Sequence, residues 1–149
     1  SIFAADLSFP ALKNAKKNAE ELETRNVYFL QGNLFGPVKS AGRNGIFDVI
    51  VSNPPYLSLA DWEQIEADIR DYEPKTALVS GPSGLEVISG IIREAPLYLR
   101  QGGHMCFEVG YGPAESVIHL FGREWTEIES WKDLAGIPRV ISAQISNLK

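Results

Sequence analysis

A short apolar run that ends in two consecutive prolines constrains this chain more than any other feature. Asp48-Val49-Ile50-Val51-Ser52 predicts a buried strand, and Asn53-Pro54-Pro55-Tyr56 follows it directly. Proline fixes φ at about −65° and has no N–H, and the residue before a proline is held extended. Open α/β sheets bind their ligands at the carboxyl ends of their strands. We therefore expect a functional site at the point where this strand ends.

The tetrapeptide is suited to hold a planar –NH₂ group. The side-chain oxygen of Asn53 and a neighbouring backbone carbonyl can each accept a hydrogen bond from one such group. Tyr56 adds an aromatic face for a flat substrate. A proline-rich turn is the plain alternative, but the buried strand before it and the aromatic residue after it weigh against that interpretation. The pattern predicts an enzyme that modifies an amide or amino nitrogen.

Composition limits the classes of protein and partner. The chain has 149 residues, which fits one domain, and 44% of them are hydrophobic, as in ordinary soluble proteins. A net charge of −5 and a pI near 5.0 weigh against tight non-specific binding to nucleic acid, which depends on Lys and Arg neutralising phosphates. No stretch approaches about 18 uninterrupted apolar residues, so no membrane span is expected.

The cysteine and histidine content predicts neither a disulfide nor a metal site. Cys106 is the only cysteine, and the two histidines are too few and too scattered for a zinc site. The chain opens at Ser1 without a methionine or a basic leader. We expect residues 1–149 to form a single catalytic domain that lacks its N-terminal portion. The sequence does not set an oligomeric state.

Strand-like and helix-like patterns alternate along the chain, which predicts a doubly wound, mostly parallel α/β sheet. Expected strands span residues 2–5, 27–30, 48–52 and 104–109. Helices are expected after the N-cap Ser8, over 59–69, over 85–99 with a kink near Ile92 caused by Pro96, and over 112–121. Residues 36–45 and 72–83 read as irregular, and Gly102-Gly103 as a helix end. The late runs 126–131 and 139–145 have no helix between them, which predicts an antiparallel hairpin at one sheet edge.

Two further polar residues end strands. Asp6 precedes a helix, where an acid accepts hydrogen bonds from ribose hydroxyls in nucleotide-binding units, although a helix cap explains it equally well. Asn33 can accept from an adenine amino group and donate to a ring nitrogen, but it also suits a plain turn. The run Gly110-Tyr111-Gly112 matches only half of a dinucleotide-loop fingerprint, so we interpret it as a strand–helix turn.

These motifs together resemble the HemK/PrmC family, whose members methylate a glutamine in peptide-chain release factors. The resemblance covers nearly the whole chain, and residues 73–84 resemble a segment of this family that the DNA amino-methyltransferases with the same tetrapeptide lack. The matching segments are Ala5-Asp6-Leu7-Ser8, Gln31-Gly32-Asn33-Leu34-Phe35, Val51-Ser52-Asn53-Pro54-Pro55-Tyr56, Tyr72-Glu73-Pro74-Lys75-Thr76-Ala77-Leu78, Ser83-Gly84-Leu85, Glu108-Val109-Gly110 and Gly136-Ile137-Pro138-Arg139-Val140.

The resemblance implies a Rossmann-like class I methyltransferase sheet that uses S-adenosyl-L-methionine and acts in the cytoplasm on the Gly-Gly-Gln glutamine of a release factor. It implies catalytic roles for Asn53, Pro54, Pro55 and Tyr56, and cofactor contacts from Asp6, Leu7, Asn33, Leu34 and Asn53. The family more often has Asp at the position of Asn33, which keeps an acceptor oxygen but loses the charge. The family's first strand, glycine-rich loop and N-terminal helical domain have no counterpart in this chain, so we expect cofactor binding only in a form extended upstream.

Two other interpretations stay open. An adenine or cytosine amino-methyltransferase acting on DNA or RNA would use the same tetrapeptide, although the acidic pI and residues 73–84 count against it. A non-catalytic remnant or partner-binding module is the second. The resemblance predicts a protein substrate, with no membrane and no direct nucleic-acid partner.

Overall fold

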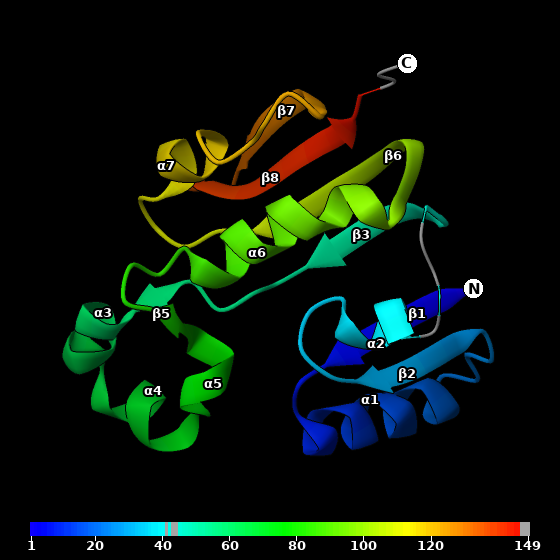
Figure 1. Cartoon of the computed structure of the whole chain (residues 1–149). Coiled ribbons are helices and arrows are strands. Elements are labelled where there is room, and N and C mark those ends of the chain that lie inside the picture. Colours follow the sequence, from blue (N-terminus) through cyan, green and yellow to red (C-terminus); the bar gives the residue numbers. More distant parts are fainter. Residues whose placement is uncertain (41, 43–44, 147–149) are drawn as a thin grey trace. The chain divides into compact units, whose positions relative to one another are not determined.

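The computed structural model describes residues 1–40, 42 and 45–146, and it divides into two compact units. The first unit is Ser1–Asn44 and the second is Gly45–Lys149. Both contain parallel strands and helices (Figure 1). The expectation that the chain is one catalytic domain stays a prediction.

The first unit is built on two parallel strands joined by a helix. Strands β1 (Ile2–Asp6) and β2 (Val27–Gln31) pair in parallel, and α1 (Phe9–Glu21) connects them. The Ser8 hydroxyl caps α1 by accepting a hydrogen bond from the Ala11 amide at 3.3 Å, and proline stands in the first turn. Leu12 is the buried residue of α1. A short helix, α2 (Gly36–Ser40), follows β2.

The second unit contains a four-stranded sheet in the order β3-β6-β8-β7. Its strands are β3 (Phe47–Ser52), β6 (Leu99–Glu108), β7 (Trp125–Lys132) and β8 (Pro138–Ile145). β3 and β6 are parallel, whereas β8 runs antiparallel to both of its neighbours and β7 forms the outer edge. The structure thus confirms the predicted α/β class with an antiparallel hairpin at its carboxyl-terminal edge.

One face of this sheet forms the core. Alternate residues of β6 and β8 are almost fully buried, including Met105, Phe107 and Ile141, because side chains of a strand point to opposite faces in turn. Helix α6 (Glu86–Glu94) adds Ile88 and Ile92 to this core. After β6, the short helix α7 (Ala114–Ile118) is followed by aromatic packing of Phe107, Phe121 and Trp125. This packing fixes the strands that carry the candidate site.

The opposite face is open at β3. Val49 and Val51 are 54% and 75% exposed, although they belong to an apolar strand. They pair in register with His104, which is exposed, and with Cys106, which is partly buried. Among the described strands, β3 hydrogen-bonds only to β6. The prediction that residues 48–52 form a strand is confirmed, but the strand is not buried on both faces.

Two predictions around Pro96 are wrong. The helix expected over 85–99 ends at Glu94 without a kink and passes into a 3₁₀ turn, η1 (Ala95–Leu97). Proline lacks the N–H that would bond four residues back, so the chain tightens and the Tyr98 amide donates to the Ala95 carbonyl instead. Gly102-Gly103 does not end that helix but lies inside β6, where the pairing with β3 shifts register.

The stretch after the tetrapeptide is more ordered than predicted. β4 (Leu57–Ser58) leads into α3 (Leu59–Gln64), and an extended Ile65 separates it from α4 (Ala67–Tyr72), so the single helix expected over 59–69 is two. Residues 72–83, expected to be irregular, contain α5 (Lys75–Leu78) and β5 (Val79–Gly81). The loop expected over 36–45 contains α2, and residues 41, 43 and 44 lie outside the described part of the chain.

Candidate functional site

The tetrapeptide lies where the sequence placed it, directly after the last residue of β3. Ser52 pairs with Phe107, so the end of β3 lies beside the end of β6. Asn53 is exposed and Pro54 is buried, whereas Pro55 and Tyr56 are partly buried. The Asn53 carboxamide makes no hydrogen bond to any residue in the described part of the chain. Its oxygen and nitrogen are therefore free to bind a ligand at the carboxyl end of the sheet.

The backbone after the tetrapeptide is tied to residues 79–81. β4 pairs in parallel with β5, and Leu57 lies opposite Val79. Ser58 and Asp61 form a capping box: the Asp61 amide donates to the Ser58 hydroxyl at 3.0 Å, and the Ser58 amide donates to the Asp61 carboxylate at 3.0 Å. The hydrogen bond from the Ser58 side chain, followed by that from its amide, lowers the pKa of Asp61.

The serine and glycine turn after β5 is also ordered. Glu86 accepts hydrogen bonds from the amide and the hydroxyl of Ser83, each at 2.8 Å. The bond from the Ser83 amide is the larger cause that lowers the pKa of Glu86. The Val87 amide donates to the Ser80 hydroxyl at 2.8 Å. Residues 79–83, which belong to the segment that resembles the family, are thus hydrogen-bonded to the start of α6 and pair through β5 with the strand that follows the tetrapeptide.

The predicted cofactor residues of the first unit lie at one end of one sheet. Asp6 pairs with Gln31, so the residues that follow β1 and β2 emerge together. The Gly32 amide donates to the Asp6 carbonyl at 3.0 Å, and the Gln31 side chain donates to the Leu7 carbonyl at 3.4 Å. Asp6, Leu7, Asn33 and Leu34 are thereby brought to the carboxyl ends of two neighbouring parallel strands.

One carboxylate oxygen of Asp6 stabilises the turn that follows β1, and the other has no hydrogen-bond partner among the described residues. Its Oδ1 accepts a hydrogen bond from the Ser8 amide at 2.7 Å, which is the local role that the sequence left open. Oδ2 has no hydrogen-bond partner among the described residues. The carboxylate is exposed, so both the turn and a ribose hydroxyl can be served by the same side chain.

The segment after β2 is conformationally strained. Leu34 has φ of 45°, which places a bulky side chain in the left-handed region that costs about 1–2 kcal/mol for a non-glycine residue. Asn33 is exposed, and its carbonyl accepts from the Gly36 amide at 3.0 Å. Strain of this kind gathers at ligand sites, where the surrounding structure holds it in place. No sequence pattern predicted this strain, because leucine rarely adopts this conformation.

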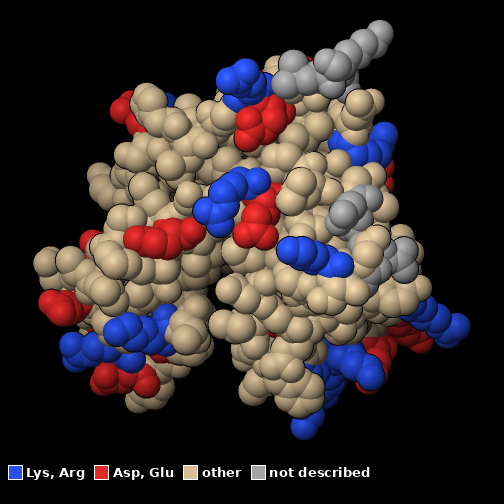
Figure 2. Space-filling model, viewed as in Figure 1, with Lys and Arg blue, Asp and Glu red and all other residues tan. Residues whose placement is uncertain are grey.

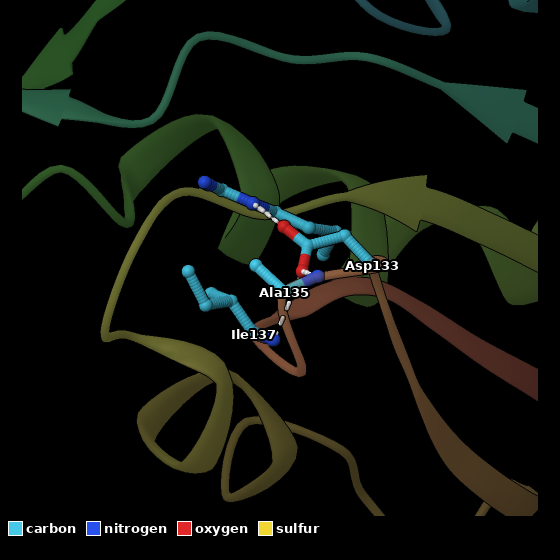
Figure 3. Close-up of polar contacts among 4 residues, drawn as sticks. Asp133, Ala135 and Ile137 are labelled. Carbon is cyan, nitrogen blue, oxygen red and sulfur yellow. Dashed lines mark hydrogen bonds and ion pairs between the residues drawn. The ribbon is translucent and has the colours of Figure 1, made fainter.

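Sequence reasoning missed the role of Asp133 at the start of the late hairpin turn. Figure 3 shows its carboxylate turned toward the amides of Ala135 and Ile137, which donate to Oδ1 at 2.9 and 3.0 Å. The Arg139 guanidinium donates to Oδ2 at 3.1 Å. The Ile137 amide and then Arg139 lower the pKa of Asp133. An Asp three residues before Gly136 is a turn signal that could have predicted this arrangement.

This turn lies beside the end of β6. The Val109 amide donates to the Arg139 carbonyl at 2.9 Å, and Glu108 pairs with Val140. The hairpin turn and the tetrapeptide therefore lie at the same end of the four-stranded sheet, the carboxyl end of β6.

Charges of both signs lie close together on the face of the molecule that is drawn in Figure 2. On the face in Figure 2, Lys and Arg side chains lie beside Asp and Glu rather than gathering into one basic area. Lys16 and Lys17, on the exposed side of α1, pair with Glu20 and Glu21. No helix within the described residues combines the length and apolar character that crossing a membrane requires.

Comparison with known proteins shows which curated proteins the chain resembles. No family model matches the chain. A release factor glutamine methyltransferase from Geobacter sulfurreducens is 39% identical over 136 residues, which are 91% of this chain and 46% of that protein. This chain is homologous to the release factor glutamine methyltransferases. Other curated relatives with the same name, at 34–37% identity, support the assignment. The chain spans about half the length of the curated relatives it matches.

Solved structures confirm the class I methyltransferase fold. A ribosomal protein L11 methylase from Lactobacillus delbrueckii aligns over 99% of this chain and 58% of its own, with a TM-score of 0.64 and 17% identity. A putative methyltransferase from Streptococcus mutans, solved in complex with SAH, aligns over 97% of this chain and 76% of its own, with a TM-score of 0.56 and 17% identity. The expected resemblance to the release factor glutamine methyltransferase family and the expected fold are therefore both confirmed.

Proposed function

We propose that this chain forms part of an S-adenosyl-L-methionine-dependent enzyme that methylates the side-chain amide nitrogen of a glutamine in a peptide-chain release factor. The observation that carries the proposal is the free, exposed carboxamide of Asn53 at the end of β3, in a chain homologous to release factor glutamine methyltransferases. The Gly-Gly-Gln glutamine is the proposed target, and the cytoplasm, where release factors act, is the proposed location.

The first unit supports a role in holding the cofactor. Asp6 has a free carboxylate oxygen for a ribose hydroxyl, and Asn33 offers an exposed carboxamide for an adenine edge. Leu7 and the strained Leu34 lie at the same end of the two strands and supply apolar contact for a base. When bound, S-adenosyl-L-methionine supplies an electrophilic methyl carbon on sulfur. These residues fit that group and would hold it.

The second unit supports the chemistry at nitrogen. A glutamine amide nitrogen is a weak nucleophile because its lone pair is delocalised into the carbonyl. In the proposed site, the Asn53 side-chain oxygen and the Pro54 carbonyl oxygen each accept a hydrogen bond from one of the two N–H groups of the substrate amide. As the nitrogen gains positive charge, these acceptors bind it more strongly than in the ground state, and this difference lowers the barrier.

The prolines make this arrangement rigid. Both fix their own φ, and Pro54 is buried, so the acceptor oxygens do not have to be ordered when the substrate arrives. The ring of Tyr56 adds an aromatic surface against which the planar substrate amide can lie. Orienting the nitrogen in line with the methyl carbon contributes the rest of the rate by proximity.

Transfer of labelled methyl groups tests the proposal. The protein that contains this chain is incubated with labelled S-adenosyl-L-methionine and either a release factor or nucleic acid. We expect label on the release factor, and none on a variant in which the glutamine of its Gly-Gly-Gln motif is replaced by alanine. Label on adenine or cytosine instead would establish the nucleic-acid alternative. Label on neither, with no binding of the cofactor, would establish a non-catalytic module.

A further inference from the structure

Gly110 lies just after β6, at the end of the sheet where the tetrapeptide also lies. A side chain at this position would collide with Tyr56. A Cβ built on Gly110 would lie 2.7 Å from Cδ2, 3.1 Å from Cε2 and 3.3 Å from Cγ of the Tyr56 ring. Gly110 is buried, and its φ lies outside the left-handed region in which only glycine is comfortable. The requirement for glycine at this position therefore comes from the Tyr56 ring and not from the backbone conformation.

A second glycine holds the backbone of the same residue. A Cβ on Gly84 would lie 2.7 Å from the Tyr56 carbonyl oxygen and 3.1 Å from the Ser58 amide nitrogen. Gly84 has φ of +82° and is buried, so it is needed for its conformation as well. The carbonyl of Tyr56 thus lies against one glycine and its ring against another, from segments 26 residues apart in the sequence.

We propose that Gly110 is a positioning residue for the methyl transfer, because its missing side chain sets where the ring of Tyr56, the last residue of the tetrapeptide that begins at Asn53, lies. The inference rests on the proposed function. Pro55 has a fixed φ immediately before Tyr56, so the backbone has little freedom to absorb a displaced ring. With alanine at position 110, the ring turns about its own side-chain bonds and changes the width of the acceptor site.

The contact distances set the size of the effect. Non-bonded carbon atoms are most stable about 3.5–4.0 Å apart, so relief of a 2.7 Å contact requires a movement of roughly 1 Å. A misplacement of about 1 Å in an active site can lower the rate about 100-fold. Gly110→Ala is therefore expected to lower kcat and kcat/KM by roughly the same factor, of that order, because the lost interaction belongs to the transition state.

A double-mutant cycle separates this role from general packing. Gly110→Ala and Tyr56→Ala are made singly and together, and the equilibrium constant of urea unfolding is measured for each. When Tyr56 is present, overpacking by the one methyl group of Gly110→Ala is expected to shift the equilibrium constant toward the unfolded state by about 5- to 150-fold. In the Tyr56→Ala background the same change is expected to have little effect, since the atoms that the new methyl group would strike are gone.

Gly103→Ala is the matched control. Gly103 is buried like Gly110 but lies within β6, and its Cβ would meet backbone oxygens of Arg100 and Phe47 at 2.9 and 3.1 Å instead of the Tyr56 ring. It is expected to destabilise the chain equally with and without Tyr56→Ala. At a temperature where the variant stays folded, its kcat is expected to match that of the unaltered protein.

Methylation of the release factor by the protein that contains this chain gives the second readout. Coupling in the unfolding cycle together with a large loss of kcat in Gly110→Ala supports the inference. Unfolding effects that add without coupling, or an unchanged kcat in a folded Gly110→Ala variant, overturn it. If the unaltered protein labels no release factor, the proposed function fails and the positioning role fails with it. The double-mutant cycle of urea unfolding then still shows whether Gly110 contacts the Tyr56 ring.

Discussion

Replacing Asn53 with alanine should abolish most of the activity while leaving the fold intact. Its side chain is exposed and has no hydrogen-bond partner among the described residues, so its loss removes no hydrogen bond within that part of the chain. Surface changes of this kind alter the free energy of unfolding by no more than about 0.5 kcal/mol. Loss of one acceptor aimed at developing charge costs about 3 kcal/mol, which corresponds to a fall in kcat of roughly 100- to 1,000-fold.

Steady-state methylation of a release factor gives kcat, and titration of S-adenosyl-L-methionine gives the cofactor affinity. We expect Asn53→Ala to lower kcat in this range and to change cofactor affinity far less. Asn14→Ala, on the exposed surface of α1, is the matched control and should change neither. A folded Asn53→Ala variant with near-normal turnover would refute the proposed role of the carboxamide.

Three further changes test the structure itself. Ile88→Ala empties a fully buried position in α6 and should lower the free energy of unfolding by about 2–5 kcal/mol in urea titrations; a loss below about 1 kcal/mol would contradict its place in the core. Ser58→Ala removes the capping box with Asp61 and should cost about 1 kcal/mol, whereas Ser58→Thr should restore most of it. Asp133 has a pKa below the ordinary 3.8, so its contribution to stability is present above that pH and is lost as the pH falls through the folded-state pKa. Asp133→Asn should therefore lower the thermal midpoint at pH 7, and the gap to the unaltered chain should narrow as the pH falls below 3.8 and through the folded-state pKa. A gap that stays constant over that range would exclude the charge of Asp133, which accepts from the Ile137 amide and from Arg139, as its cause.

The strands were largely predictable because their patterns are local. Period-two and continuous apolar runs identified all four strands expected in the two units, and the lack of a helical stretch before β8 identified the hairpin. The predicted start of α1 was also correct, because Ser8 and Pro10 are strong local signals. Local chemistry of this kind needs no knowledge of the rest of the fold.

The errors arose where neighbouring segments decide the structure. Residues 79–81 form a strand because Leu57 and Ser58 lie alongside, which no local pattern reveals. Gly102 ends no helix, because the register shift between β3 and β6 takes it into the strand. The sequence predicted a helix kink at Pro96, but a 3₁₀ turn satisfies the Tyr98 amide without one.

The candidate site was predictable in outline but not in its supports. The position of Asn53 at a strand end, and the approach of Asp6 to the segment after β2, follow from topology. The dependence of Tyr56 on Gly110, and the left-handed Leu34, are properties of three-dimensional contacts and could not be read from the residue types. Whether the named site residues perform their assigned roles stays a prediction.

The exposed valines of β3 have a practical consequence for anyone who prepares this chain by itself. Val49 and Val51 present an apolar surface on one face of the strand, against which another polypeptide can pack. Concentrated samples should therefore associate, and a lysine at position 51 should keep them apart. Because the same strand runs straight into Asn53, any such association would also lie beside the candidate site.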